Sequence, residues 1–160
     1  MGWKELVDSM GLLPHPEGGY YREIWRSPGL VPGKRPGTIR NAATSILFLI
    51  PGDGCSRLHR LASDETWVHR AGGELELVEL ALGAPALRTV IGSAGPTGFP
   101  HSHTIPAGTW FGARPVAGSG FALVECTVAP GFDFADFELG KSETLLEEYP
   151  GARGEIQELS

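Results

Sequence analysis

Short apolar segments that alternate with glycine- and proline-rich turns constrain the fold of this chain more than any other feature. The 160 residues include 23 glycines and 13 prolines, and the turns recur at roughly ten-residue spacing. Between them, segments such as 43–50 and 121–128 have the length and the Ile, Val, Leu and Phe content of buried strands. This pattern is typical of antiparallel sandwiches and barrels, so we predict an all-β fold. The length suits one domain, which we place at residues 1–150.

Short helices are expected at the two ends of this domain. Apolar residues recur at helical spacing between residues 3 and 10, and Gly11 follows them as a helix-ending residue. Ser142 is expected to cap a second short helix, which Pro150 ends. Residues 151–160 are mostly polar, and we expect them to form a frayed tail.

Two strand segments carry unusual patterns. The apolar positions of residues 75–82 change phase after Leu77, which predicts a β-bulge. Glu125 stands between apolar residues in a strand that is otherwise buried in character, and a carboxylate there needs a partner or a wet pocket. We therefore interpret Glu125 as lining a pocket and Cys126, which faces the other way, as part of the core.

Composition argues against several classes of partner. The formal net charge is −6, and the basic residues form no stripe, so we expect no nucleic-acid partner. The longest apolar run, residues 46–50, is too short to span a bilayer, and no signal-peptide pattern is present, so we expect no membrane association. The two cysteines, Cys55 and Cys126, do not make a disulfide framework, which fits a reducing, cytoplasmic location.

The chemistry of the chain concentrates in the segment 54–72. Side chains alternate along a strand, so two histidines in a His-x-His pattern lie on one face, where a nearby carboxylate completes three sides of a metal site. His59 and Glu65 stand at such spacing. Leu61, however, stands where the second histidine of the pattern would be.

This segment resembles the first motif of the cupin superfamily, in which a glycine turn is followed by His-x-His, a glutamate and a second glycine. The matching residues are Gly54, His59, Glu65 and Gly72. The second cupin motif, Pro-x-Gly-x-x-His, resembles residues 106–111, except that Phe111 replaces the histidine.

A narrower resemblance, to one small cupin family of unknown function, extends from about residue 6 to about residue 150. Its motifs stand in order as HPEGGY at 15–20, HRLxSDExW at 59–67, PAGTW at 106–110 and APGFDF at 129–134. The resemblance implies a cupin jelly-roll barrel with a pocket inside it, and a homodimer. It does not imply an established reaction.

The same resemblance implies that the positions of His59, Leu61, Glu65 and Phe111 converge on the pocket. Leu61 and Phe111 cannot coordinate a metal, and even catalytic zinc sites normally keep three protein ligands. We therefore expect no cofactor. The alternative is a divalent-metal site, whose ligands would be His59, Glu65 and either His69 or His103.

The leading hypothesis for function is a metal-independent cupin that resembles the sugar epimerases and isomerases. His59 would act as the base, with Glu65 as its orienting partner, because an imidazole beside a carboxylate in a pocket can transfer protons near neutral pH. The partner molecule would be small, polar and carbohydrate-like. Two alternatives stay open: a metal-dependent cupin enzyme, and a non-catalytic ligand-binding or sensory cupin.

Further residues are expected to contact the ligand. Two tryptophans could form flat apolar walls, and Tyr21 with Arg22 could close the pocket or anchor an anionic group. The predicted contacts are Tyr21, Arg22, Trp67, His69, His103, Trp110, Phe111 and Glu125.

Overall fold

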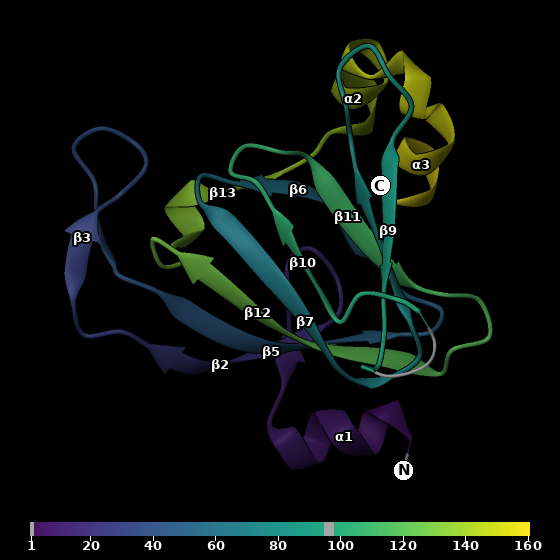
Figure 1. Cartoon of the computed structure of the whole chain (residues 1–160), viewed down its shortest axis with the longest axis horizontal. Coiled ribbons are helices and arrows are strands. Elements are labelled where there is room, and N and C mark those ends of the chain that lie inside the picture. Colours follow the sequence, from purple (N-terminus) through teal and green to yellow (C-terminus); the bar gives the residue numbers. More distant parts are fainter. Residues whose placement is uncertain (1, 95–97) are drawn as a thin grey trace.

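The structure is a computed structural model that describes residues 2–94 and 98–160. Two antiparallel sheets face each other across a shared core (Figure 1). The six-stranded sheet has the order β1-β2-β5-β12-β7-β10, with bounds Leu13–Pro14 (β1), Tyr20–Arg26 (β2), Thr44–Pro51 (β5), Phe121–Ala129 (β12), Asp64–Gly72 (β7) and Ser102–Ile105 (β10). The five-stranded sheet has the order β13-β6-β11-β8-β9, with bounds Phe137–Leu139 (β13), Ser56–Leu61 (β6), Phe111–Pro115 (β11), Leu75–Glu79 (β8) and Leu87–Ile91 (β9).

A separate two-stranded ribbon, β3 (Leu30–Pro32) and β4 (Ile39–Asn41), projects from one end of the sandwich (Figure 1). The predicted all-β fold is confirmed, since each strand pairing in the described residues is antiparallel.

The main core lies between the sheets and is built by strand alternation. In β12, Val124 and Cys126 face inward and join this core. Glu125 between them therefore faces outward, where Arg70 of β7 donates to its carboxylate. The prediction that Glu125 lines a pocket is wrong, because the strand has the opposite phase from the one expected.

Helix α1 (Trp3–Met10) covers the outer face of the six-stranded sheet (Figure 1). Its apolar side packs over Leu49 and Leu123, and Gly11 ends it in the left-handed conformation at φ 62°. The predicted N-terminal helix is confirmed. In the part of the chain that the structure describes, no helix combines the length and apolar character needed to cross a membrane.

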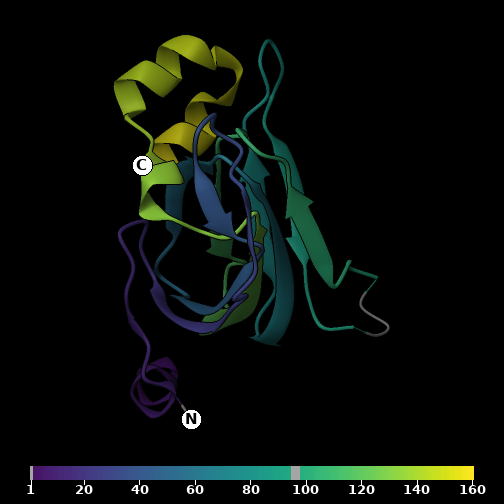
Figure 2. The same ribbon diagram turned by 90° about the vertical axis from the view of Figure 1, so that its left-hand side faces the viewer.

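Two C-terminal helices, α2 (Ser142–Glu148) and α3 (Arg153–Glu158), cover the outer face of the five-stranded sheet, at the opposite end of the molecule from α1 (Figure 2). Short 3-10 turns, η1 (Phe134–Asp136) and η2 (Pro150–Ala152), precede them. The expected frayed tail is wrong, because Ile156 and Leu159 are buried against Val78 of β8 in a second core.

This second core also explains the phase change after Leu77. β8 pairs with both neighbours in regular register, so the predicted bulge is absent from this described strand. Leu75 and Leu77 face the core between the sheets, while Val78 faces the C-terminal helices. A strand that is covered on both sides carries apolar residues on both faces, and this mimics a change of phase.

Candidate functional site

His59 lies on β6 with only 1% of its side chain exposed. Its Nδ1 lies 2.7 Å from the carbonyl oxygen of Arg57, and since a carbonyl can only accept, Nδ1 carries a hydrogen and donates it. Its Nε2 lies 3.0 Å from Oε2 of Glu17. A single proton is therefore shared between Nε2 and this carboxylate. The hydrogen-bonded partner of His59 is Glu17, where the sequence analysis expects Glu65.

Glu17 belongs to the turn between β1 and β2, which the HPEGGY motif encodes. The turn packs against β6 so closely that a Cβ on Gly18, at φ 105°, would collide with the carbonyl of Cys55. The backbone carbonyl of Glu17 accepts from the Arg57 amide at 2.7 Å, and its Oε1 accepts from Ser56 Oγ at 2.9 Å. These contacts hold the buried carboxylate beside His59.

The electrostatics favour a carboxylate on Glu17 and an imidazolium on His59. Burial opposes the ionisation of Glu17, but the charge and hydrogen bond of His59, with smaller help from the Ser56 hydrogen bond, lower its pKa below the ordinary value. Burial likewise opposes a charge on His59, but the charge and hydrogen bond of Glu17 raise its pKa. The pair is a buried, charge-assisted contact.

Glu65 lies at the start of β7 and is 6% exposed. Burial, and to a lesser extent the charge of Glu17, raise the pKa of Glu65 to about 8, against smaller opposing effects of His59, Cys126 and Trp67. At neutral pH this group is therefore a neutral carboxylic acid. The site therefore joins two carboxyl groups whose surroundings shift their pKa values in opposite directions.

Both carboxyl groups line a cavity of about 30 Å³, here called the inner cavity. Its walls are His15, Glu17, Tyr21, Ile46, Leu61, Glu65 and Phe132. A larger depression of about 480 Å³, here called the outer groove, shares Tyr21, Ile46 and Phe132 with it. The remaining residues of the outer groove are Glu23, Arg26, Asp133 and Phe134. The inner cavity has room for about two waters, so it fits the end of a molecule whose remainder lies in the outer groove.

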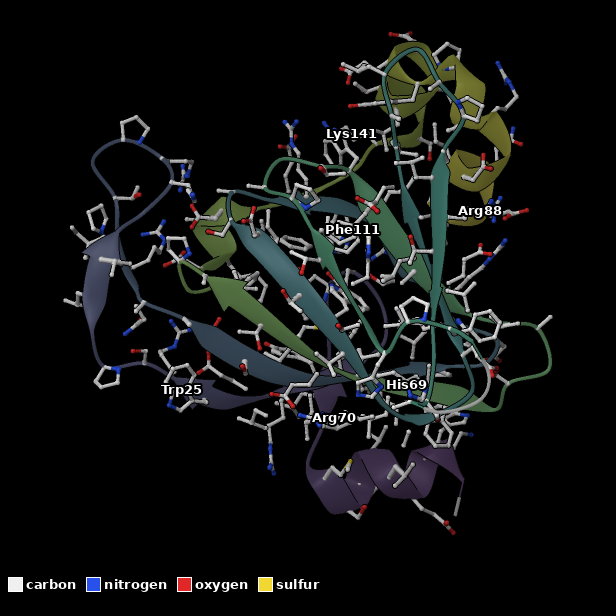
Figure 3. All side chains as sticks on the ribbon, viewed as in Figure 1. Trp25, His69, Arg70, Arg88, Phe111 and Lys141 are labelled. Atoms are coloured by element: carbon white, nitrogen blue, oxygen red, sulfur yellow. The ribbon has the colours of Figure 1, made fainter. Side chains whose placement is uncertain are left out.

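The described residues do not fit the metal centre that the cupin fold can carry. Leu61, at the second histidine position, is an apolar wall of the inner cavity. Phe111, at the histidine position of the second motif, packs between the sheets with its ring centroid 4.3 Å from that of His59 (Figure 3). Within residues 2–94 and 98–160, no group of three or more His, Cys, Asp or Glu is arranged to hold a metal ion. Of the donors that remain, His59 is engaged at both ring nitrogens, by Glu17 and by the carbonyl of Arg57.

The two compensating histidines do not reach the inner cavity. His69 Nε2 donates to the carbonyl of Gly73 at 2.9 Å, near one end of β7 (Figure 3). His103 Nε2 lies 2.7 Å from Oε2 of Glu79, in a hydrogen bond that links β10 to the facing sheet. The structure thus corrects the expectation that either residue completes a metal site or contacts a ligand there.

Three more predicted contacts also lie elsewhere. Trp110 is buried beneath the C-terminal helices, with the Arg60 guanidinium 4.5 Å from its ring centroid. Arg22 is exposed on β2. Trp67 is completely buried and packs edge-on against Phe48 and Phe111, so it belongs to the core. Of the predicted ligand contacts, Tyr21 lines the inner cavity, whereas Phe111 packs behind it against His59.

Sequence reasoning missed two residues of the site, His15 and Glu17. Both come from the turn before β2, and the contact that brings Glu17 to Ser56 spans 39 residues of sequence. Strand periodicity does not register such a contact. The signal that could have found them is a charged residue followed by two glycines, because that pattern marks a tight turn that packs closely on its neighbour.

Comparison with known families identifies the chain. A model described as "Cupin superfamily (DUF985)" matches residues 4–140. The chain belongs to this family. A hypothetical protein from Leishmania major is 34% identical, with 100% of this chain and 99% of that chain covered and a TM-score of 0.89. A protein from Shewanella oneidensis is 33% identical, with 100% and 98% covered and a TM-score of 0.89.

More distant cupins share the fold alone. Oxalate decarboxylase from Bacillus subtilis is 14% identical, with 92% of this chain and 36% of that chain covered and a TM-score of 0.57. This likeness confirms the predicted cupin jelly roll. No match was found among curated proteins. The function of this cupin must therefore be argued from its own site.

Proposed function

We propose that this cupin binds a small polar molecule at the inner cavity and catalyses proton transfer on it without a metal, as an isomerase or epimerase would. The observation that carries the proposal is that Glu17 and Glu65 line one cavity whose surroundings shift their pKa values in opposite directions. Proton transfer needs a carboxylate that can accept a proton and an acid that can donate one. Environments that shift the pKa values of two carboxyl groups in opposite directions are typical of acid–base pairs.

In this proposal Glu17 is the base, because it lines the inner cavity while His59 lies behind it. His59 is a positioning residue that fixes the Glu17 carboxylate through its 3.0 Å contact. Glu65 is the acid. The roles differ from those expected from the sequence, in which His59 is the base and Glu65 its partner.

The reaction is written for a compound with a hydroxyl group next to a carbonyl. Glu17 takes the proton from the hydroxyl-bearing carbon, the C–H electron pair forms a carbon–carbon double bond, and the carbonyl oxygen takes the proton of Glu65. Glu17 then returns its proton to the former carbonyl carbon, while the neighbouring hydroxyl gives its proton to Glu65. Both carboxyl groups are restored, and the product is the isomer.

Proton NMR in D₂O tests the proposal with a panel of small aldoses, ketoses and hydroxyketones. The wild-type protein should cause a time-dependent loss of the signal from the carbon-bound proton next to the carbonyl. Glu17→Gln should slow this exchange by about 100-fold or more, because a positioned base contributes at least that much. Glu125→Gln is the matched control and should retain the rate, because Glu125 lies on the outer face with Arg70.

Three other results would contradict parts of the proposal. Exchange that persists in Glu17→Gln would contradict the assignment of the base. Binding of a panel compound, detected by a rise in melting temperature, without any exchange would favour a non-catalytic binding cupin. A chelator should leave the exchange rate unchanged, and a loss of rate that divalent ions restore would favour a metal-dependent enzyme instead.

A further inference from the structure

His15 is a residue of the inner cavity that the proposed proton transfer does not use. Its side chain is only 5% exposed. The ring packs at 4.6 Å, centroid to centroid, edge-on against Tyr21, and other aromatic rings surround it at longer distance. Its Nδ1 accepts a hydrogen bond from the backbone N–H of Glu17 at 3.1 Å. Both the ring position and its tautomer are therefore fixed by the turn.

The other ring nitrogen of His15 is an unused donor. Since Nδ1 accepts, the hydrogen of the neutral ring is on Nε2. Burial, aided by the charge of His59 and opposed by that of Glu17, lowers the pKa of His15, which keeps the ring neutral. Within residues 2–94 and 98–160, Nε2 of His15 forms no hydrogen bond. Unlike Nε1 of Trp67, it is not completely buried, so a ligand can reach it. A nearly buried N–H without a partner points to a group that arrives with a ligand.

The charges around the inner cavity limit which kind of ligand group can accept a hydrogen bond from His15. None of the residues that line it is Lys or Arg, and Glu17 is ionised. Arg26, in the outer groove, is paired with Glu23 at 2.6 Å. A carboxylate or phosphate that entered would lose its hydration and face the Glu17 charge, while the nearby cation, His59, is already paired with Glu17 at 3.0 Å. An uncharged carbonyl oxygen avoids these costs and can accept from the histidine.

We propose that His15 determines specificity at this site: its Nε2–H binds the carbonyl oxygen of an uncharged ligand, and the cavity rejects carboxylates and phosphates. The inference rests on the proposed function, which puts the ligand in the inner cavity, and it adds the substrate class. The substrate is an uncharged carbonyl compound. His15 acts on it as a neutral hydrogen-bond donor that polarises the carbonyl.

Acetamide and acetate test the proposal, because they have nearly the same size and shape and differ in charge. Each is titrated at about pH 7 into the full-length protein labelled with ¹⁵N-histidine. Acetamide should shift the His15 Nε2 resonance saturably, and acetate should bind at least about tenfold more weakly. Equal or tighter binding of acetate would overturn the proposal, and so would the absence of a saturable shift with either probe.

Two variants separate the hydrogen bond from packing, with the His59 resonances as the reporter of binding. His15→Gln keeps a side-chain N–H and should bind acetamide within a fewfold of wild type. His15→Phe keeps an aromatic ring without the donor and should bind at least about tenfold more weakly. Wild-type affinity in His15→Phe would overturn the proposal. Acetamide binding at His15 without isotope exchange in any hydroxyketone would refute the proposed function alone, whereas exchange with equal affinity for charged analogues would refute this inference alone.

Discussion

At the scale of single residues, the contact between Glu17 and His59 is the feature most open to test. Glu17→Gln removes the negative charge that raises the pKa of His59 and puts a neutral amide in place of the carboxylate, while the burial that lowers this pKa remains. We expect His59 to lose its proton at neutral pH and the free energy of unfolding to fall by about 3 kcal/mol. Histidine NMR titration and urea denaturation measure the two effects.

Glu125→Gln is the control for this experiment, since it removes the same charge from the ion pair with half-exposed Arg70. Its cost should stay below about 1 kcal/mol, and His59 should titrate as in the wild type. A His59 titration that is unchanged in Glu17→Gln would show that the buried pair is not ionised.

The residues of the site were predictable only where strand alternation governs them. His59, Leu61 and Glu65 belong to strands, and the resemblance to the first cupin motif implied a common site for them. Glu17 and His15 belong to a turn whose partners are far away in sequence, so no local pattern indicates that the turn closes over β6. The consequence was chemical as well as structural, because the missed carboxylate is the one that His59 contacts.

At the scale of elements, alternation predicts that neighbours face opposite sides but not which side is buried. β12 shows this ambiguity, since both of its faces are covered in part: one by the main core, the other by α1. The presence of Glu125 does not show which face of β12 is buried, because Arg70 on the neighbouring strand donates a hydrogen bond to its carboxylate on the outer face. The phase of such a strand is decided by tertiary pairing.

The C-terminal helix α3 was not predicted from the sequence. The segment 151–160 buries three apolar residues, Ala152, Ile156 and Leu159, and the polar residues between them suit the solvent-facing side. Ile156→Ala should lower the free energy of unfolding by about 2–5 kcal/mol, because it leaves a cavity in the second core. Urea denaturation measures this loss.

Gln157→Ala provides the matched control on the same helix, because Gln157 is exposed. Its effect should lie within about 0.5 kcal/mol of zero. If the two variants were equally stable, residues 153–158 would not be packed on the sheet, and the expected frayed tail would be restored.

At the scale of the whole molecule, the fold was predictable because several independent patterns agree on it. Turn spacing indicated a sandwich, and the ordered motifs indicated a cupin, which the family match over residues 4–140 confirms. What the patterns did not contain is the division into a main core and a second core beneath α2 and α3, since this depends on which strands are covered twice. The homodimer implied by the resemblance stays a prediction.

The free energy of unfolding of the whole molecule should depend on pH through the ionisation of Glu65. Its pKa is about 8 in the folded protein and 4.5 ordinarily, so folding takes up a proton between these values. The stabilising contribution of the neutral acid is therefore complete below pH 4.5 and is lost as the pH rises toward 8. Glu17 has the opposite effect on the pH dependence of stability. Its pKa is lowered in the folded protein, so its stabilising contribution is lost only as the pH falls through that folded-state pKa.

Glu65→Gln isolates this contribution, since glutamine resembles the protonated acid and does not titrate, while Glu17 and His59 remain. The free energy of unfolding of the wild type should decline relative to that of Glu65→Gln across this range, by at most about 1.4 kcal/mol for each pH unit. Urea denaturation of both proteins at about pH 5, 6, 7 and 8 measures the difference. Parallel curves would mean that Glu65 is ionised in the folded state, and the proposed acid would then have no proton to give at neutral pH.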